Sequence, residues 1–486
     1  MKNCVILAAG DGRRMKSSLP KPLHDVAFKP MLGWVLDTAT QVCGKIALVI
    51  SDDKTPGSGG QLVREYCEQN YRGTEITYFV QNERRGTGHA VIQAGELINA
   101  TAEYEIIGLH GVEIGGDILV LCGDAPFVDA ATINEAYESH KNGRFDITVI
   151  SAYVEEPTGY GRIIRGKQGI QIKEERDCDG AEREITEVNS GVYWFRAGAL
   201  KEVLPRIKPE NAAGEYYLTD TLEAASHIGF TVQAFRSMNR HFCLGANFRR
   251  DLRELSKIAY NNEINRVLDS GVDVIGENVL IGPDVCIGMD TKILPNTIIC
   301  GSTVIGEDCV IGPNCVIKSC AIGSGVVLDN VKATDAVVED GAKVGPFAQL
   351  RPGTRIRKNV KIGNFVEIKN SDVGAKTSVA HLTYIGDSDV GGGCNFGCGC
   401  VTANYDGVRK FRTTIGDDCF IGCNTNFIAP VTVGDRATTA AGSTIYRDVP
   451  PESLAIERGE QVNKPGWVIK EIKKSDSGAQ NFGKSI

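Results

Sequence analysis

The chain has 486 residues, of which 42% are hydrophobic and 23% charged, a globular composition too long for one ordinary core, so two or more domains are expected. A formal net charge of −8 argues against a general nucleic-acid binder, and no apolar run is long enough to span a membrane. The first apolar run has only five residues before glycines follow, which is too short for a signal peptide, so a cytoplasmic protein is expected.

Residues 1–250 alternate between strand-like and helical stretches, which predicts an α/β domain of Rossmann-like type with a mostly parallel sheet. In such sheets, ligands bind beyond the C-terminal ends of the strands. Gln61–Asn70 and His89–Ile98 are two of the expected helices. The expected strands are Cys4–Ala8, Ile46–Ile50, Ile76–Val80, Ile118–Cys122, Ile147–Ala152 and Val192–Phe195.

The first strand leads into a glycine-rich turn, LAAGDGRRM, from Leu7 to Met15. Its small residues would let the backbone approach a phosphate chain, and Arg14 and Lys21 supply positive charge. Most glycine-rich turns are only turns, and this one lacks the GxGxxG spacing of dinucleotide folds, so the turn alone is a weak indication.

Further polar groups follow the later strands. Gln81 precedes the glycine-containing turn Gly86–Ala90, which opens a helix. Asp124 stands at a strand tip, where it is either a Mg²⁺ ligand or only a capping aspartate before Pro126; Mg²⁺ prefers few protein oxygens together with phosphates and waters. The next such groups are Gly159-Tyr160-Gly161-Arg162, Glu174 and Asn189-Ser190-Gly191.

Together, these residues resemble the nucleotide-sugar pyrophosphorylases, a nucleotidyltransferase family, over nearly all of residues 1–250. The resemblance implies that Arg14 and Lys21 are catalytic and that Asp124 and Asn247 share Mg²⁺. The family commonly has threonine where this chain has Arg13, a change that bears on nucleotide affinity. The implied site for UTP and the UDP-sugar consists of Leu7, Ala8, Ala9, Gly10, Gly12, Lys21, Gln81, Gly86, Thr87, Gly161, Glu174, Asn189 and Asn247.

A periodic apolar segment between 247 and 270 predicts one long helix ending at Gly271. We therefore expect a first domain at 1–250, a helical linker at 251–271 and a second domain at 272–486.

Beyond this helix, isoleucine recurs every six residues, a period that fits neither a helix nor a plain strand. A six-residue repeat predicts a parallel β-helix in which each hexapeptide is one short strand and one corner. The isoleucines should point inward, Val, Thr or Cys should fill a narrower inward position, and glycine should serve the corners. By itself, such a repeat could serve only stacking or trimer formation. The isoleucines are Ile275, Ile281, Ile287, Ile293, Ile299, Ile305, Ile311 and Ile317.

An irregular block, 380–413, interrupts this repeat, and loops on a rigid scaffold often carry function. Arg351 and Lys369 are eighteen residues apart, one three-sided coil, so they should stack on one face and could pair with a sugar phosphate. His381 is either an ordinary surface histidine or a base that accepts a proton from an attacking amine.

The sixteen cysteines are expected to be mostly small buried fillers in a reducing compartment. Cys394, Cys398 and Cys400 lie close together, but the spaced second pair of a zinc site is missing, so a metal site there is not favoured.

The repeat and the block resemble the acetyltransferase half of the bifunctional N-acetylglucosamine-1-phosphate uridylyltransferase / glucosamine-1-phosphate N-acetyltransferase family, and the full match runs from Val5 to about Trp467. It implies a left-handed parallel β-helix, a homotrimer and His381 as the base. Cys398 and Cys423 stand where Ala and Ser are common in that family. The implied binding residues are Arg351, Lys369, Tyr384 and Asn395 for the amino-sugar phosphate, and Cys398, Asn404, Tyr405, Cys423, Ala440 and Arg458 for acetyl-CoA.

The implied function is acetyl transfer from acetyl-CoA to glucosamine 1-phosphate, followed by Mg²⁺-dependent transfer of UMP from UTP to N-acetylglucosamine 1-phosphate. The product, UDP-N-acetylglucosamine, feeds bacterial cell-wall synthesis. One alternative is a sugar-1-phosphate nucleotidyltransferase of other specificity whose β-helix only oligomerises. Another is a non-catalytic nucleotide-sugar sensor, which the presence of Lys21, Asp124 and Asn247 argues against.

Overall fold

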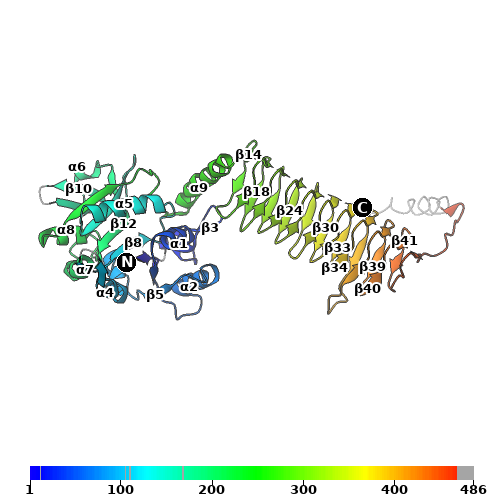
Figure 1. Cartoon of the computed structure of the whole chain (residues 1–486), viewed down its shortest axis with the longest axis horizontal. Helices are drawn as coiled ribbons and strands as arrows, with labels where there is room; N and C mark the ends of the chain where they lie inside the picture. Colours follow the sequence, from blue (N-terminus) through cyan, green and yellow to red (C-terminus); the bar gives the residue numbers. More distant parts are fainter. Residues whose placement is uncertain (11, 104, 109–110, 167–168, 468–486) are drawn as a thin grey trace, which may run out of the picture. The chain divides into compact units, whose positions relative to one another are not determined.

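The computed structural model describes residues 1–10, 12–103, 105–108, 111–166 and 169–467, without the side chains of 13, 105–108 and 111–114. The chain divides into two compact units (Figure 1). Unit 1 comprises Met1–Asn265 and Ile281–Pro283, and unit 2 comprises Arg266–Leu280 and Asp284–Ile486. The division falls within α9 (Arg249–Asp269), the long helix that the periodic apolar segment predicts.

Unit 1 is built on a mixed sheet whose main path is β11-β10-β12-β8-β1-β4-β5. Its centre is parallel, with β1 (Lys2–Leu7) between β8 (Asp117–Cys122) and β4 (Lys45–Ile50), and β5 (Ile76–Val80) beside β4. Beyond this centre, β12 (Glu187–Arg196) runs antiparallel to β8. The sheet is therefore parallel where the predicted nucleotide residues lie and mostly antiparallel farther out, where only β13 and β9 pair in parallel among the described strands. Strand periodicity does not encode this change of direction. Its other strands are β9 (Ile147–Tyr153), β10 (Arg162–Gly166), β11 (Gly169–Lys173) and β13 (Val232–Arg236).

Helices cover both faces of this sheet, because successive strand side chains point to opposite sides. Ile6 of β1 packs in one apolar cluster with Leu36, whereas Val5 packs in a second cluster with Val91. Full burial of such a side chain stabilises the fold by roughly 1.5–3 kcal/mol. The first cluster involves α1 (Met31–Val42), α2 (Gly59–Asn70) and α5 (Ala130–Asn142); the second involves α3 (Thr87–Gln93), α4 (Gly95–Ala102), α7 (Ala197–Val203) and α8 (Asp220–His227).

One predicted helix, His89–Ile98, is two helices in the structure. Ala94 separates α3 from α4 because its backbone, with φ −83° and ψ 19°, leaves the helical region. The short remaining elements of unit 1 are η1 (Arg13–Met15), η2 (Lys21–Leu23), β2 (Asp25–Val26), β3 (Lys29–Pro30), β6 (Glu105–Gly108), β7 (Gly111–Ile114), α6 (Gly180–Arg183) and η3 (Leu204–Arg206).

Unit 2 is a parallel β-helix of three strand stacks, which confirms the prediction from the six-residue repeat. The stacks begin at β14 (Asp273–Val274), β15 (Leu280–Ile281) and β16 (Cys286–Ile287), and the first ends at β43 (Leu454–Ala455). Residues eighteen apart pair between neighbouring coils, as in Ile293↔Ile311. Each coil therefore takes three hexapeptides.

The interior of the β-helix follows the repeat closely. Thr291, Thr297, Thr303, Cys309 and Cys315 are fully buried at the narrow inward position. The inward isoleucines are also buried, except that Ile275 is 45% exposed in the first coil and Ile287 is partly buried.

The corners of the coils differ from the prediction, because asparagine and aspartate occupy many of the left-handed positions expected for glycine. Asn278, Asn296 and Asn314 all have positive φ, and their amides form a ladder in which Nδ2 donates to Oδ1 of the next coil at 3.1 and 3.2 Å. Short polar side chains tolerate this conformation. Gly288 serves packing instead: a Cβ there would lie 2.7 Å from the carbonyl carbon of Gly306.

Candidate active sites

The first candidate site is a pocket of about 280 Å³ at the C-terminal end of β1. Many of the predicted nucleotide residues line it, and Arg84 and Glu215, which the sequence did not single out, line it as well. Ala8 is buried in the core behind the pocket. The predicted residues in the lining are Leu7, Ala9, Gly10, Lys21, Gln81, Gly86, Thr87 and Asp124; a neighbouring hollow shares Gly10 and Lys21 and adds Gly12, Arg14 and Asn247.

Glycine is required at two positions of this pocket. Gly12 has φ +62°, and a Cβ there would lie 2.9 Å from Cβ of Lys21. Gly86 has φ +110°, and its Cβ would lie 2.4 Å from the carbonyl oxygen of Tyr216. Both glycines therefore allow the approach of neighbouring segments that a side chain would prevent. Gln81 is buried beside this turn and donates from Nε2 to the carbonyl of Gly86 at 3.2 Å.

The charged groups of the pocket converge on Lys21. Its Nζ forms an ion pair with Oδ2 of Asp124 and donates to Oδ1 of Asn247 at 2.9 Å. Arg14 donates from Nη2 to the same Asn247 oxygen at 2.8 Å. The carboxylate and amide oxygens predicted to bind Mg²⁺ thus already surround a cationic nitrogen. Oxygen donors of this kind, few in number, fit Mg²⁺ that is completed by phosphates and water. The side chain of Arg13 lies outside the described part of the chain.

The three residues expected at the sugar lie together beside this pocket. The backbone N–H of Asn189 donates to the carbonyl of Gly161 at 2.8 Å, and a Cβ on Gly161 would lie 3.4 Å from Oε1 of Glu174. Burial raises the pKa of Glu174 although Thr219 donates to its carboxyl group. The negative charges of Glu174 and Asp124 both help to raise the pKa of Cys122, a pocket-lining thiol whose own burial is the main cause. Burial thus dominates the electrostatics of this part of the first candidate site.

The second candidate site lies on unit 2, where Arg351 and Lys369 follow one strand stack and His381 belongs to another. The backbone N–H of Arg351 donates to the carbonyl of Ile368 at 2.8 Å, so Arg351 and Lys369 occupy neighbouring coils, as their eighteen-residue spacing predicts. Arg351 also forms an ion pair with Glu367 at 2.8 Å. Tyr384 pairs with Glu367 from the next coil, between β33 (Tyr384–Gly386) and β30 (Glu367–Lys369).

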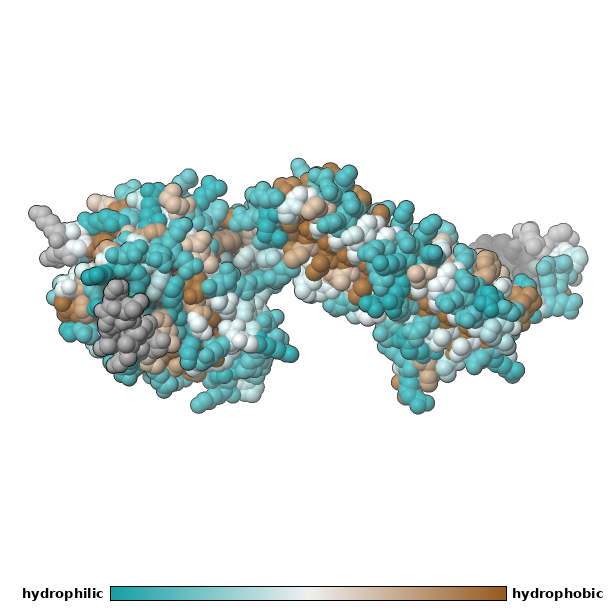
Figure 2. Space-filling view, in the orientation of Figure 1, coloured by the Kyte–Doolittle hydropathy of each residue, from teal (hydrophilic) through white to brown (hydrophobic). Residues whose placement is uncertain are grey.

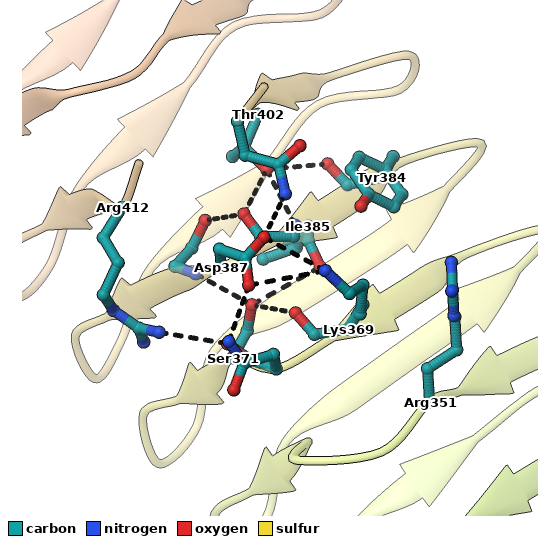
Figure 3. Close-up of polar contacts among 12 residues, drawn as sticks. Arg351, Lys369, Ser371, Tyr384, Ile385, Asp387, Thr402 and Arg412 are labelled. Atoms are coloured by element: carbon teal, nitrogen blue, oxygen red, sulfur yellow. Dashed lines mark hydrogen bonds and ion pairs between the residues drawn. The ribbon is translucent and has the colours of Figure 1, made fainter. Parts of the chain in front are cut away.

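Asp387, which the sequence did not single out, organises this site (Figure 3). Its carboxylate accepts from Lys369 at 3.1 Å, from Asn370 at 2.6 Å and from the amide of Asn404. Burial raises the pKa of Asp387, but the hydrogen bonds from Asn370, Lys369 and Asn404 outweigh it, so the pKa falls below its ordinary value of 3.8. One buried carboxylate thus holds both the predicted phosphate-binding Lys369 and the predicted acetyl-CoA residue Asn404.

Lys410 is a second residue that the sequence did not single out. It lies in the loop after β36 (Val401–Ala403), where its backbone forms an isolated antiparallel β-bridge with Tyr405. The neighbouring ammonium group of Lys369 lowers the pKa of Lys410, with a smaller contribution from Arg351, and the negative charge of Asp387 opposes both. Lys369 and Lys410 therefore repel each other, and an anion bound beside them would offset their positive charge. The basic residues around Lys410 in the sequence could have indicated a site for an anion.

His381 ends β32 (Ser378–His381) and its ring is exposed to solvent. Its Nδ1 lies 2.5 Å from Oδ1 of Asn364, the residue directly below it at the end of β29 (Lys361–Asn364). Asn395 stacks on Ser378 one coil further along the same face. Asn364 is a further residue of this site that the sequence did not single out. It precedes His381 by 17 residues, one fewer than the eighteen-residue coil.

The remaining residues expected at acetyl-CoA follow one line of coils. The backbone carbonyl of Cys398 accepts from the N–H of Asn424, and that of Cys423 accepts from the N–H of Gly442. The guanidinium of Arg458 donates to the carbonyl of Ala441. Cys423 and Arg458 are exposed, Cys398 is partly exposed, and Ala440 is partly buried in the same coil as Ala441. Tyr405 lies in the loop after β36, and its hydroxyl donates to the carbonyl of Gly407.

All sixteen cysteines carry free thiols, and most are buried or partly buried. Among the described residues, no group of three or more His, Cys, Asp or Glu side chains is arranged to hold a metal ion, Cys394, Cys398 and Cys400 included. None of the helices that the structure describes combines the length and hydrophobicity of a membrane span.

Comparison with known proteins agrees with this division. Residues 3–238 match the Nucleotidyl transferase family, and 287–319, 335–370 and 412–447 match the Bacterial transferase hexapeptide family. The fold and the two sites therefore define a transferase with a nucleotidyltransferase unit and a left-handed parallel β-helix of hexapeptide repeats.

Curated relatives match along nearly the whole chain. A Bifunctional protein GlmU of Clostridium botulinum (strain 657 / Type Ba4) is 43% identical over 476 residues, which cover 97% of this chain and 99% of the relative. Those of Caldanaerobacter subterraneus subsp. tengcongensis and Geotalea uraniireducens are each 41% identical over 97% and 96% of this chain and 98% of the relative. The chain belongs to the bifunctional GlmU family and is a transferase enzyme.

Proposed function

We propose that the chain catalyses two successive reactions on one sugar phosphate. Unit 2 transfers acetyl from acetyl-CoA to the amine of glucosamine 1-phosphate. Unit 1 then joins N-acetylglucosamine 1-phosphate to UTP and releases pyrophosphate, giving UDP-N-acetylglucosamine for bacterial cell-wall synthesis. The observation that supports this proposal most strongly is that the chain has two separate cation-rich sites, one around Lys21 and one around Lys369. In addition, its relatives match along 97% of the chain.

In unit 1, a phosphate oxygen of the sugar phosphate attacks the α-phosphorus of UTP, and the bond to pyrophosphate breaks. Lys21 and Arg14 line the hollow beside Gly10 and Gly12, and in this proposal they stabilise the charge of the triphosphate during the transfer. Gln81, Gly86 and Thr87 orient the base, while Gly161, Glu174 and Asn189 hold the sugar. Asp124 and Asn247 would hold Mg²⁺, which when bound neutralises phosphate charge.

In unit 2, Arg351, Lys369 and Lys410 would bind the phosphate of the amino sugar, whose negative charge offsets their mutual repulsion. Tyr384 and Asn395 would contact the sugar, placing its amine near His381. The amine nitrogen attacks the thioester carbonyl carbon, His381 accepts the proton that leaves this nitrogen, and the thiolate of CoA departs. Acetyl-CoA would lie along Cys398, Asn404, Tyr405, Cys423, Ala440 and Arg458.

A homotrimer is part of the proposal. Apolar side chains are exposed on the early coils of unit 2, among them Met289 at 55%, Val304 at 53% and Val316 at 37%, and Figure 2 shows the hydrophobic surface over these coils. Contiguous apolar surface of this kind favours association. Sedimentation equilibrium should give three times the chain mass, and a stable monomer with full acetyltransferase activity would contradict the trimer. The free thiols fit a reducing, cytoplasmic setting.

Separate assays of the half-reactions test the proposed function. With glucosamine 1-phosphate and acetyl-CoA, the purified chain should release CoA; with UTP, Mg²⁺ and N-acetylglucosamine 1-phosphate, it should release pyrophosphate. Uridylyl transfer without any CoA release would instead support a nucleotidyltransferase whose β-helix only oligomerises.

A further inference from the structure

The exposed ring of His381 depends on one polar neighbour for its orientation. Asn364 and His381 are paired residues of adjacent parallel strands, so their side chains leave the same face one coil apart. Oδ1 of Asn364 lies 2.5 Å from Nδ1 of His381. Asn364 is itself partly buried, whereas the ring of His381 is exposed.

The backbone around this pair is fixed on both coils. The N–H of Leu382 donates to the carbonyl of Asn364 at 3.0 Å, and the hydroxyl of Thr383 donates to the carbonyl of His381 at 2.8 Å. Phe365 and Leu382, which follow the two residues, have φ of 56° and 47°. Both strands therefore turn at the same point, which keeps the amide and the imidazole aligned.

The contact has a chemical consequence for the ring. An amide oxygen can only accept a hydrogen bond, so Nδ1 of His381 must carry the proton and donate it. In a neutral imidazole the other nitrogen, Nε2, then carries the lone pair. An amide adds no negative charge beside the ring, so it selects this tautomer without favouring the protonated imidazolium as a carboxylate would.

We infer that Asn364 is a positioning residue of the acetyltransferase site, which holds His381 in the Nδ1–H tautomer and presents Nε2 as the atom that accepts the proton of the amine. This inference rests on the proposed role of His381 in acetyl transfer. It predicts that the loss of Asn364 lowers the rate of chemistry and leaves substrate binding largely unchanged.

Two substitutions separate positioning from general support of the fold. Asn364→Leu keeps the size of the side chain and removes the acceptor, whereas Asn364→Asp keeps an acceptor and adds a charge. Asn426→Leu, on an exposed strand position of the same β-helix, is the matched control. For each full-length variant, kcat and KM for both substrates of acetyl transfer are measured from pH 6 to 9, together with thermal unfolding and uridylyl transfer.

We expect Asn364→Leu to lower kcat by about 10- to 100-fold, less than the roughly 10²–10⁴-fold loss expected without the base, with KM values and unfolding close to those of the parent. Asn364→Asp should keep its activity at high pH and lose it at neutral pH. In the plot of kcat against pH, the acid limb of this variant should move to higher pH by about one pH unit or more, because the carboxylate stabilises the imidazolium.

The inference is overturned if Asn364→Leu retains the parental kcat, or if it loses no more than Asn426→Leu. It is also overturned if Asn364→Asp leaves the acid limb in place, an outcome that decides the matter even if Asn364→Leu does not fold. His381→Ala serves as the reference: full acetylation by that variant would refute the proposed base itself, whereas an inactive His381→Ala beside a fully active Asn364→Leu would refute the inference alone.

Discussion

Nζ of Lys21 lies 2.9 Å from Oδ1 of Asn247, although 226 residues separate them in the sequence. Lys21 also pairs with Asp124, so residues from the start, the middle and the end of unit 1 meet at one nitrogen. The first candidate site is thus complete only when the whole unit has folded.

Asp124→Ala should abolish uridylyl transfer, because both the proposed metal site and Lys21 lose their carboxylate partner. Acetyl transfer should persist, since its proposed residues all lie in unit 2. Pyrophosphate release and CoA release are measured on the same preparation. Near-normal formation of UDP-N-acetylglucosamine by this variant would show that Asp124 has no essential role.

His381→Ala should lower acetyl transfer by roughly 10²–10⁴-fold, the usual cost of losing a positioned general base. Binding of acetyl-CoA should remain, and uridylyl transfer should continue when N-acetylglucosamine 1-phosphate is supplied. An ordinary surface histidine predicts no change in either reaction, and a misfolded β-helix predicts loss of acetyl-CoA binding too. Both rates and acetyl-CoA affinity are therefore measured on one preparation.

Asp387→Asn should raise KM for glucosamine 1-phosphate more than it lowers kcat, because Lys369 and Asn404 lose the charge that holds them. The pKa of Asp387 lies below its ordinary value of 3.8, so the ionised group stabilises the fold above that pH. This stabilisation is lost as the pH falls through the lowered value. Thermal unfolding should separate parent and variant at pH 7 and bring them together in strong acid; a constant gap would contradict this account.

Asp220→Asn should stabilise unit 1 at alkaline pH. Burial and the nearby charges of Glu223, Glu174 and Asp177 raise the pKa of Asp220 from 3.8 to about 6. The favourable contribution of the protonated group is complete below 3.8 and is lost as the pH rises through about 6.

Thermal unfolding should therefore favour Asp220→Asn over the parent at pH 8 more than at pH 5, by roughly 2–4 °C for each kcal/mol gained. Asp129→Asn, at the N-cap of α5, is the control for the effect of removing a negative charge at the start of a helix. An equal effect of Asp220→Asn at both pH values would argue against a raised pKa.

Regular repeats and buried strands were predictable from the sequence because each follows a period that burial imposes. Ile293 and Ile311 pair as their spacing requires, and β4 buries every residue of the predicted run Ile46–Ile50. Strand direction was not predictable: β12 is antiparallel to β8, and hydrophobic alternation is the same for both directions.

The candidate sites were predictable mainly where a residue belongs to a motif. Gly12, Gly86 and Asp124 do, and they line the pocket or its margin. Asp387 and Asn364 were missed because their roles come from contacts between coils. A carboxylate in a GDSD turn reads as a surface group, and only the structure brings Lys369, Asn370 and Asn404 onto it.

A single reaction mixture shows most directly whether one chain carries out both transfers. The purified chain receives glucosamine 1-phosphate, acetyl-CoA, UTP and Mg²⁺, and all products are quantified by mass spectrometry. We expect UDP-N-acetylglucosamine with one CoA and one pyrophosphate released for each molecule formed, and no such product without acetyl-CoA. Formation of UDP-glucosamine instead, or of pyrophosphate without CoA, would contradict the proposal.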